Sequence, residues 1–112
     1  MPMNAEQDRL RLRHMLDAAE KIVAFTKGLS ATDFQADEKL QLAVVRLLEI
    51  AGEAANGLSD EMKEGHPEIP WSQITATRNR LIHGYFDVDL NVVWKIIVED
   101  IPALLDRLRA II

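Results

Sequence analysis

The sequence predicts an all-α protein, an up-and-down bundle of four main helices plus a short helical turn. Apolar residues recur every three or four positions in four separate segments, which is the spacing of one helix face. No segment shows the strict alternation of apolar and polar residues that is typical of strands. Leu, Ile, Ala and Val are plentiful, whereas the chain has only one Tyr, two Trp and three Phe. Such a composition suits helices that pack on helices.

The first expected helix begins after Asn4, an N-cap residue with Gln7 three positions on as its capping-box partner. Gly28 is expected to stop this helix, because glycine readily adopts the left-handed conformation of a C-terminal cap. The polar stretch 30–36 follows, and we expect a short helical turn around Phe34. The apolar face of the first helix comprises Leu12, Met15, Ala19, Ile22 and Val23.

A second helix is expected to end near Gly57, because glycine weakens helical structure. The stretch 59–71 contains Gly65, Pro67 and Pro70, which predicts a short helical turn followed by an irregular loop. The apolar seam of the second helix alternates by four and three positions, as in helix bundles. It comprises Leu40, Val44, Leu47, Ala51, Ala54 and Leu58.

A third long helix is expected to start at Gln73 with Ser72 as its N-cap, and Gly84 is expected to end or bend it. This helix matters most for function, because it carries the densest group of polar and ionisable residues in the chain. Its expected inward residues are Ile74, Thr77 and Leu81.

Asp89 is expected to cap a last helix. Pro102 should kink this helix near Ile101, because proline lacks a backbone N–H and clashes with the preceding turn. The seams of the second and last helices are long, so part of their surface is available to pack against a second copy of the chain. The seam of the last helix comprises Leu90, Val93, Trp94, Ile97, Ile101, Leu104, Leu108 and Ile111.

Bulk properties predict a single cytoplasmic domain that spans residues 1–112. A chain of 112 residues is too short for two good cores. It has no cysteine, which excludes a disulfide framework and a thiolate zinc site. The N-terminus lacks the basic flank and apolar core of a signal peptide, and the apolar stretches are too short to span a bilayer. A membrane partner is therefore not expected.

The formal net charge of -5 argues against binding of nucleic acid through bulk electrostatic attraction. Any contact with RNA must then come from a local basic site. Oligomerisation would help by gathering several such sites.

The three histidines are scattered and do not predict a metal site. His14 lies among arginines of the first helix, where a solvated surface residue is expected, and His66 lies in a loop between Gly65 and Pro67. No His and Glu pair occurs at the helical spacing that metal ligands need. We expect neither a metal nor a cofactor.

One segment concentrates the polar chemistry of the chain: Thr77-Arg78-Asn79-Arg80-Leu81-Ile82-His83-Gly84-Tyr85-Phe86. Asn79 and His83 are four residues apart and share a helix face, whereas Arg78 and His83 diverge by about 140° on one ideal helix. The arginine and the histidine can reach one phosphate only if Gly84 bends the segment or a second copy supplies half of the site. These positions predict a two-fold dimer whose motif helices cross at a shared groove.

Such a groove would favour cleavage of an RNA phosphodiester without a metal. The 2′-hydroxyl of RNA can attack its own phosphate if a base takes its proton and cations stabilise the crowded phosphorane. Histidine suits proton transfer near neutral pH, and the arginine fork matches phosphate oxygens. The alternative is structural: Arg80 can be a plain surface cation, and an Arg and His pair on a helix usually has no catalytic role.

The segment Arg78-Asn79-Arg80-Leu81-Ile82-His83-Gly84-Tyr85 matches the R-x4-H-x-Y signature of HepT-like toxins in the HEPN superfamily. The polar residue after the arginine, here Asn79, is also typical of HEPN nucleases. The stretch 45–55 resembles the second long helix of the family, and 69–72 resembles its lead-in to the motif helix. The resemblance covers almost the whole chain, and 44–94 most specifically.

This resemblance implies a HEPN-like homodimer that acts as an RNA endonuclease toxin of a type VII system. It also implies a partner antitoxin, a minimal nucleotidyltransferase of the MntA type; DNA is not expected as a partner. By position, Arg78 would stabilise the phosphate, His83 would be the acid and base, and Asn79 would orient His83 or the scissile group. Tyr85 would be the hydroxyl that the antitoxin modifies with AMP. The added phosphates would oppose RNA binding through charge and volume.

Two further residues, Arg80 and Glu53, are weaker candidates for the lining of the groove, since a solvated helix glutamate is the simpler interpretation of Glu53. Two other functions stay open. The chain can be a non-catalytic helical subunit that binds substrate for a nucleotidyltransferase complex, which its acidic charge favours. It can also be a scaffold dimer that uses only its apolar seams.

Overall fold

The computed structural model describes the backbone of residues 2–83 and 88–112 and the side chains of residues 5–77 and 88–112. Every regular element in these ranges is helical, which confirms the all-α fold class. The elements are α1 (Pro2–Thr26), α2 (Ala31–Gln35), α3 (Glu38–Asn56), α4 (Asp60–Gly65), α5 (Trp71–His83), α6 (Leu90–Lys95), the π-helical turn η1 (Ile96–Asp100) and α7 (Ile101–Ile111).

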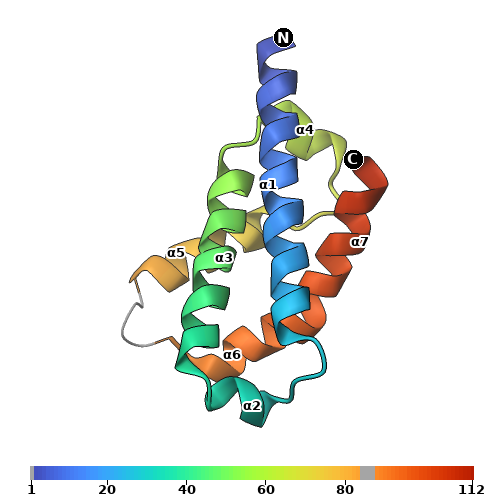
Figure 1. Ribbon diagram of the computed structural model, residues 1–112. Coiled ribbons are helices and arrows are strands. Elements are labelled where there is room, and N and C mark those ends of the chain that lie inside the picture. The colour runs from blue at the N-terminus through green and yellow to red at the C-terminus, as the bar shows by residue number, and fades with distance from the viewer. Residues whose placement is uncertain (1, 84–87) are drawn as a thin grey trace.

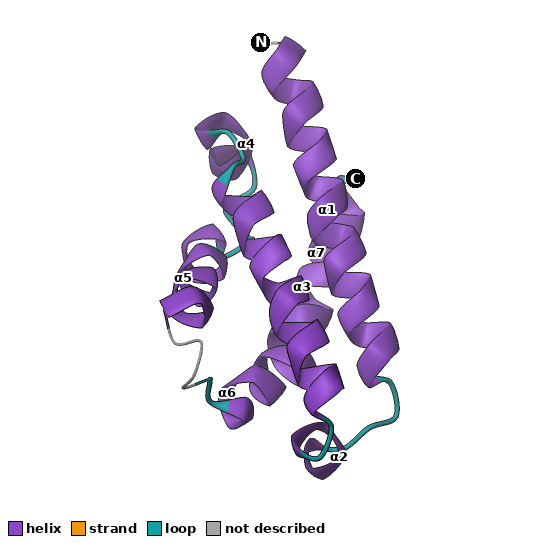
Figure 2. Ribbon diagram, turned by 60° about the vertical axis from the view of Figure 1, so that its left-hand side comes forward, coloured by secondary structure: helices purple, strands orange, loops and turns teal. Residues whose placement is uncertain are grey.

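The long helices α1, α3 and α7 lie side by side, with α1 running opposite to the other two (Figure 1). Helix α3 packs against α1 on one side and against α5 on the other, as Figure 2 shows. Helix α5 crosses α3 instead of running along it, whereas α2 and α6 close one end of the bundle (Figure 1). Helix α3 is therefore the element that holds α5 in place.

The predicted short helix around Phe34 is confirmed as α2, and its capping explains why so few residues form a helix. Ser30 and Asp33 cap each other: the Asp33 N–H donates to Ser30 Oγ at 3.2 Å, and the Ser30 N–H donates to Asp33 Oδ2 at 2.9 Å. Asp37 then caps α3 by accepting from the Leu40 N–H at 3.0 Å. Gly28, with a φ of 77°, lies in the turn after α1, where the sequence predicted a stop.

Two predicted N-caps are wrong. Asn4 lies inside α1, because the helix already includes Pro2, whose fixed φ suits a first helical position. Ser72 lies inside α5, because the Ile74 N–H donates to the Pro70 carbonyl at 3.0 Å and the helix begins at Trp71. The predicted cap of the last segment is confirmed, since Asp89 Oδ1 accepts from the Asn91 N–H at 2.9 Å.

The buried side chains form two clusters, one at each end of the bundle. Phe34, with no exposed surface, belongs to the cluster at the α2 end, where its ring lies 5.6 Å from that of Trp94. The rest of that cluster is Ala19, Ile22, Val44, Leu48, Val93, Ile97, Ile101 and Leu105. The second cluster lies under α4 and the start of α5, and it comprises Leu12, Met15, Ala54, Ala55, Leu58, Ile69, Trp71, Leu104 and Leu108.

The predicted interruption of the last helix is confirmed, and its form is a π-helical turn. The Ile101 N–H donates to the carbonyl of Ile96, five residues back, instead of four. Pro102 follows at once and has no N–H with which to continue the α-helical ladder. The result is that α6 and α7 are separate helices joined by a widened turn.

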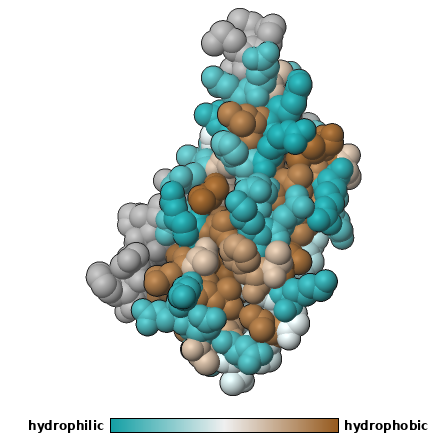
Figure 3. All heavy atoms as spheres, viewed as in Figure 1, coloured by the Kyte–Doolittle hydropathy of each residue, from teal (hydrophilic) through white to brown (hydrophobic). Residues whose placement is uncertain are grey.

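Among the described residues, no helix combines the length and apolar character needed to cross a membrane. Large apolar side chains that reach solvent are spread over the surface, and Figure 3 shows apolar and polar residues intermixed on one face. The most exposed are Leu42, at 57%, and Leu10, at 55%. Isolated apolar residues of this kind are normal on protein surfaces.

Candidate active site on helix α5

Helix α5 carries four of the predicted site residues on one stretch of helical backbone. Arg78, Asn79, Arg80 and His83 all lie between its start and the last described residue of the element. On a regular helix, positions 78 and 83 are about 140° apart around the axis and about 7.5 Å apart along it. The described backbone therefore keeps the geometry that led us to expect a second copy at the site. Tyr85 and the predicted bend at Gly84 lie outside the described residues.

Trp71 anchors the start of α5. Its side chain is only 8% exposed, and its indole N–H is shared between the carbonyls of His66, at 3.0 Å, and Lys63, at 3.1 Å. A buried indole N–H without a partner is costly, so these acceptors hold the ring in one place. The loop after α4 thereby determines where α5 begins.

The start of α4 is itself attached to α1 through a buried carboxylate. Asp8, 5% exposed, accepts from the Ser59 N–H at 2.9 Å and from the Ser59 hydroxyl at 2.6 Å. The Ser59 oxygen also accepts from the Met62 N–H at 3.1 Å and caps α4. Residues on α1, α4 and the following loop thus position α5, although they are 12 or more residues away from the motif in sequence.

The predicted inward positions of α5 are confirmed where the structure describes them. Ile74 packs against the second buried cluster, and Thr77 is half-buried. The Thr77 hydroxyl donates to the Gln73 carbonyl at 2.9 Å, one helical turn back. The side chain of Leu81 lies outside the described set.

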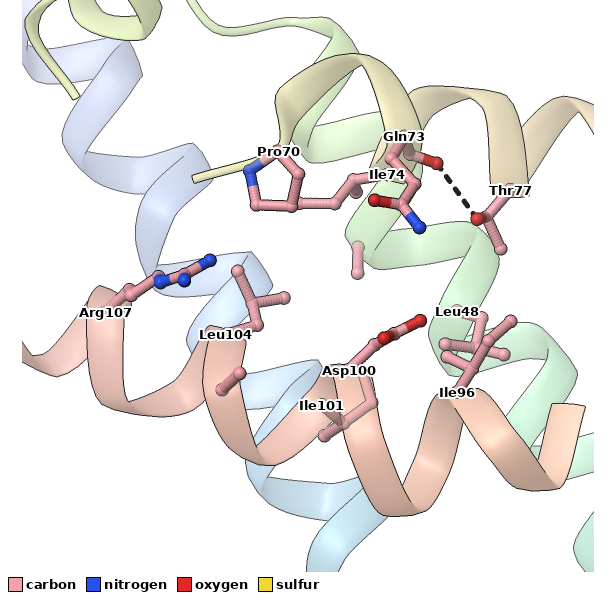
Figure 4. A pocket seen from close by; sticks show the side chains of 12 residues that line it. Leu48, Pro70, Gln73, Ile74, Thr77, Ile96, Asp100, Ile101, Leu104 and Arg107 are labelled. Atoms are coloured by element: carbon pink, nitrogen blue, oxygen red, sulfur yellow. Dashed lines mark hydrogen bonds between the residues drawn. The ribbon is translucent and has the colours of Figure 1, made fainter. Parts of the chain in front are cut away.

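A groove of about 330 Å³ lies between α5 on one side and η1 with α7 on the other. Leu48 and Ala51 of α3 form its floor. Figure 4 shows Gln73 and Thr77 on the α5 side and Asp100 and Arg107 on the opposite side. Thr77 directly precedes Arg78, so the groove reaches the beginning of the motif.

Comparison with known proteins identifies the family. A family model described as ribonuclease HepT-like matches residues 15–111. The chain belongs to the ribonuclease HepT-like family. The prediction of a HepT-like ribonuclease is thus confirmed at the level of the family.

Several relatives of this HepT-like chain are named as candidate ribonucleases. It is 46% identical to a candidate ribonuclease HepT of Thermococcus cleftensis over 83% of its own length and 84% of the relative. It is 40% identical to a candidate RNase of Caldanaerobacter subterraneus over 90% of each chain. A candidate RNase of Methanocaldococcus jannaschii is 37% identical, with 83% of this chain and 85% of the relative covered. No solved structure matches the chain.

Glu53 of this HepT-like chain lies apart from the described part of α5. It is exposed on α3 and lines a shallow hollow with residues of α1, among them Leu10 and His14. Its role at the groove stays a prediction, as do the roles of Arg78, Asn79, Arg80 and His83. Among the residues that the structure describes, no three His, Asp or Glu side chains are placed to share a metal ion.

Sequence reasoning missed that Gln73, Asp100 and Arg107 line a groove beside the motif helix. Asp100 and Arg107 are seven positions apart on the last helical segment, which is a spacing that keeps residues on one face. That spacing was a usable signal for a shared face. Nothing in the local pattern indicated that this face lies opposite α5.

Proposed function

We propose that this chain is a metal-independent RNA endonuclease and the toxin of a type VII toxin–antitoxin system. One observation carries the proposal: a member of the ribonuclease HepT-like family places Arg78, Asn79 and His83 on a single anchored helix. Histidine and arginine are the residue types that proton transfer and phosphate binding require. The names of the relatives agree with this activity.

In the proposed reaction, His83 removes the proton of an RNA 2′-hydroxyl, and the 2′-oxygen attacks the adjacent phosphorus. The bond from phosphorus to the 5′-oxygen then breaks, and that oxygen leaves with a proton from the imidazolium. The products are a 2′,3′-cyclic phosphate and a 5′-hydroxyl end. Arg78 stabilises the additional negative charge on the phosphorane, and Asn79 orients His83 or the scissile group.

The proposed active unit is a two-fold dimer. Because positions 78 and 83 diverge by about 140° on a regular helix, one copy alone does not direct both toward the same phosphate. Two α5 helices that cross at a symmetry axis bring Arg78 of one copy near His83 of the other. A dimer also doubles the local positive charge in a chain with a formal net charge of -5.

The purified chain, prepared without its partner, should cleave RNA in the presence of excess EDTA. The expected reaction needs only an imidazole and cations from the protein. Removal of free metal ions should therefore leave the cleavage rate within about twofold of the rate without EDTA. Gel analysis of a labelled RNA, with end-group mapping of the products, measures both rate and chemistry. Lack of any cleavage by unmodified protein would instead favour the non-catalytic substrate-binding subunit.

Control of the toxin is proposed to act through Tyr85, the only tyrosine of the chain. An MntA-like nucleotidyltransferase transfers AMP from ATP to the phenolic oxygen, and pyrophosphate leaves. The attached phosphate brings negative charge to the place where RNA phosphate must bind, two residues from His83. The modified protein should therefore bind and cleave RNA poorly.

Co-expression with the partner nucleotidyltransferase should add mass in steps of one AMP unit, and cleavage should fall with the modified fraction. Intact-mass spectrometry followed by peptide mapping measures the number and place of the additions. Tyr85→Phe is the matched control, since it keeps the ring and removes the acceptor oxygen. Additions mapped to another residue, or additions that persist in Tyr85→Phe, would contradict this assignment.

A further inference from the structure

The groove beside α5 has the build of a small ligand site. Its volume of about 330 Å³ lies in the range of pockets that hold small molecules, and it has room for one nucleobase and part of its ribose. Its walls are mostly apolar, with Leu48, Ile74, Ile101 and Leu104 around the cavity. Apolar walls of this kind can cover the face of a base and remove it from water.

Three polar side chains enter this apolar groove, one each from α5, η1 and α7. Figure 4 shows the amide of Gln73 on the α5 side, with the Asp100 carboxylate and the Arg107 guanidinium opposite it. Within the side chains of residues 5–77 and 88–112, neither Asp100 nor Arg107 takes part in an ion pair. The Thr77 hydroxyl donates to the backbone of its own helix. An amide, a carboxylate and a guanidinium therefore face the cavity with hydrogen-bonding capacity available to a ligand.

The wall of the groove that carries Asp100 is a π-helical turn. A π-helical turn contains one more residue than an α-helical turn, so it changes which side chains face a neighbouring helix. Here Ile96 at its start and Asp100 at its end both line the groove. Such turns occur frequently at functional sites. This one lines a candidate ligand site in addition to accommodating Pro102.

We propose that this groove is a base-binding subsite that holds a guanine of the RNA next to the scissile phosphate. The inference rests on the proposed ribonuclease function and adds a base preference to it. Asp100 accepts hydrogen bonds from the N1–H and the 2-amino group of the guanine, and the Gln73 amide donates to its O6. Arg107 binds a neighbouring phosphate at the mouth of the groove.

Guanine fits the carboxylate better than the other bases do. It presents two adjacent donors on its Watson–Crick edge, which match the two oxygens of one carboxylate. Adenine and cytosine place an acceptor nitrogen beside their amino group, and uracil flanks its single N–H with two carbonyl oxygens. Each of these three bases brings a lone pair toward the negative charge of Asp100.

The position of the groove on α5 explains why the base would lie next to the cleaved bond. The groove extends along α5 from Gln73 to Thr77, and Arg78 is the next residue. Successive residues of a helix advance by about 1.5 Å. An RNA strand with its phosphate at this end of α5 therefore has an adjacent nucleotide within reach of the groove.

The decisive experiment combines a base series with an Asp100→Asn variant. Labelled RNAs that differ at one position beside the mapped cleavage point carry guanosine, inosine, adenosine, cytidine or uridine there. The native protein should cleave the guanosine RNA with a kcat/KM about tenfold above that of the adenosine RNA, the size expected for a bidentate base contact. Inosine, which keeps N1–H but lacks the 2-amino group, should fall between them. Asp100→Asn should remove most of this preference, because the variant loses one of the two acceptors for guanine and the negative charge that repels the other bases.

Glu99→Gln is the matched control, because Glu99 is the neighbouring carboxylate, is exposed, and contacts Lys95 at 4.0 Å instead of lining the groove. This variant should keep the guanosine preference. Equal cleavage of all five RNAs by the native protein, or an unchanged preference in Asp100→Asn, would overturn the subsite and leave the nuclease proposal standing.

Binding separates the subsite from catalysis. His83→Ala protein should still bind the guanosine RNA about tenfold more tightly than the adenosine RNA, measured by fluorescence anisotropy, because the base contact does not involve His83. If the native protein shows no cleavage, this preference still tests the groove. Equal binding of the two RNAs would then reject the subsite as well.

A groove-filling variant tests whether a second copy of the chain occupies the groove instead of a base. Ala103 is exposed and lines the groove, so Ala103→Trp should fill the cavity and reduce the guanosine preference at least fivefold, toward that of Asp100→Asn. Ala110→Trp, also exposed on α7 but away from the groove, is the control. A change in molar mass by light scattering with the base preference intact would identify the groove as a contact between copies and overturn the proposal.

Discussion

His83→Ala is expected to lower the rate of RNA cleavage by a factor of about 10²–10⁴, the range that a positioned general acid or base contributes. The proposed reaction needs one group that accepts the 2′-proton and then supplies a proton to the 5′-oxygen. Alanine can do neither. A water molecule that the protein does not position transfers protons less efficiently than a positioned imidazole. Single-turnover cleavage of a labelled RNA measures the effect directly, because it separates the chemical step from product release.

Arg78→Ala should cause a loss of similar size, since it removes the cation that stabilises the phosphorane. His14→Ala is the matched control, because His14 is an exposed histidine on α1. Circular dichroism and light scattering should show that all three variants keep the helicity and the assembly of the native protein. Cleavage at the native rate by both His83→Ala and Arg78→Ala would reject the proposed catalytic residues.

Phe34→Ala is expected to lower the free energy of unfolding by about 3–5 kcal/mol, the usual cost of removing a buried aromatic side chain. Phe34 has no exposed surface and lies on α2, a helix of five residues that has little stability of its own. Its ring joins the cluster that contains residues of α1, α3, α6 and η1, and it packs against Trp94 at 5.6 Å. Removal of the ring therefore has two effects: it leaves a cavity, and it removes the contact that holds α2 on the bundle. Urea unfolding followed by circular dichroism gives the change.

Phe25→Ala is the control for this experiment. Phe25 is 49% exposed at the end of α1, so the same substitution there should cost less than about 1 kcal/mol. The contrast between the two phenylalanines tests the packing and not the residue type. Similar losses for both variants would show that the α2 end is not the rigid cluster described here.

Much of the helical organisation could be predicted, because it depends on near neighbours in the chain. The buried faces of α1, α3 and α7 follow the three- and four-residue spacing of Leu, Ile, Val and Ala. The cap at Asp89 and the interruption before Pro102 depend on the chemistry of one side chain each. The misplaced caps at Asn4 and Ser72 show the limit: proline at the helix start decided one boundary, and the buried Trp71 decided the other.

The candidate site was predicted in part. The R-x4-H-x-Y segment led to the family that the comparison shows, and the helix that carries the segment is α5. The surroundings of that helix could not be predicted, because they depend on contacts between distant residues. Asp8 holds Ser59 across 51 positions, and Trp71 reaches the carbonyls of Lys63 and His66.

By itself, the sequence determined that this protein is helical and that its arginine, amide and imidazole lie on one helix, since helical spacing and side-chain identity are properties of short stretches. Only the tertiary structure decided what lies opposite that helix. Gln73 and Asp100 line the same groove because α5 and the η1–α7 segment lie on opposite sides of it, with α3 as its floor. Those arrangements arise from the packing of whole helices, for which no short stretch of the chain carries a signal.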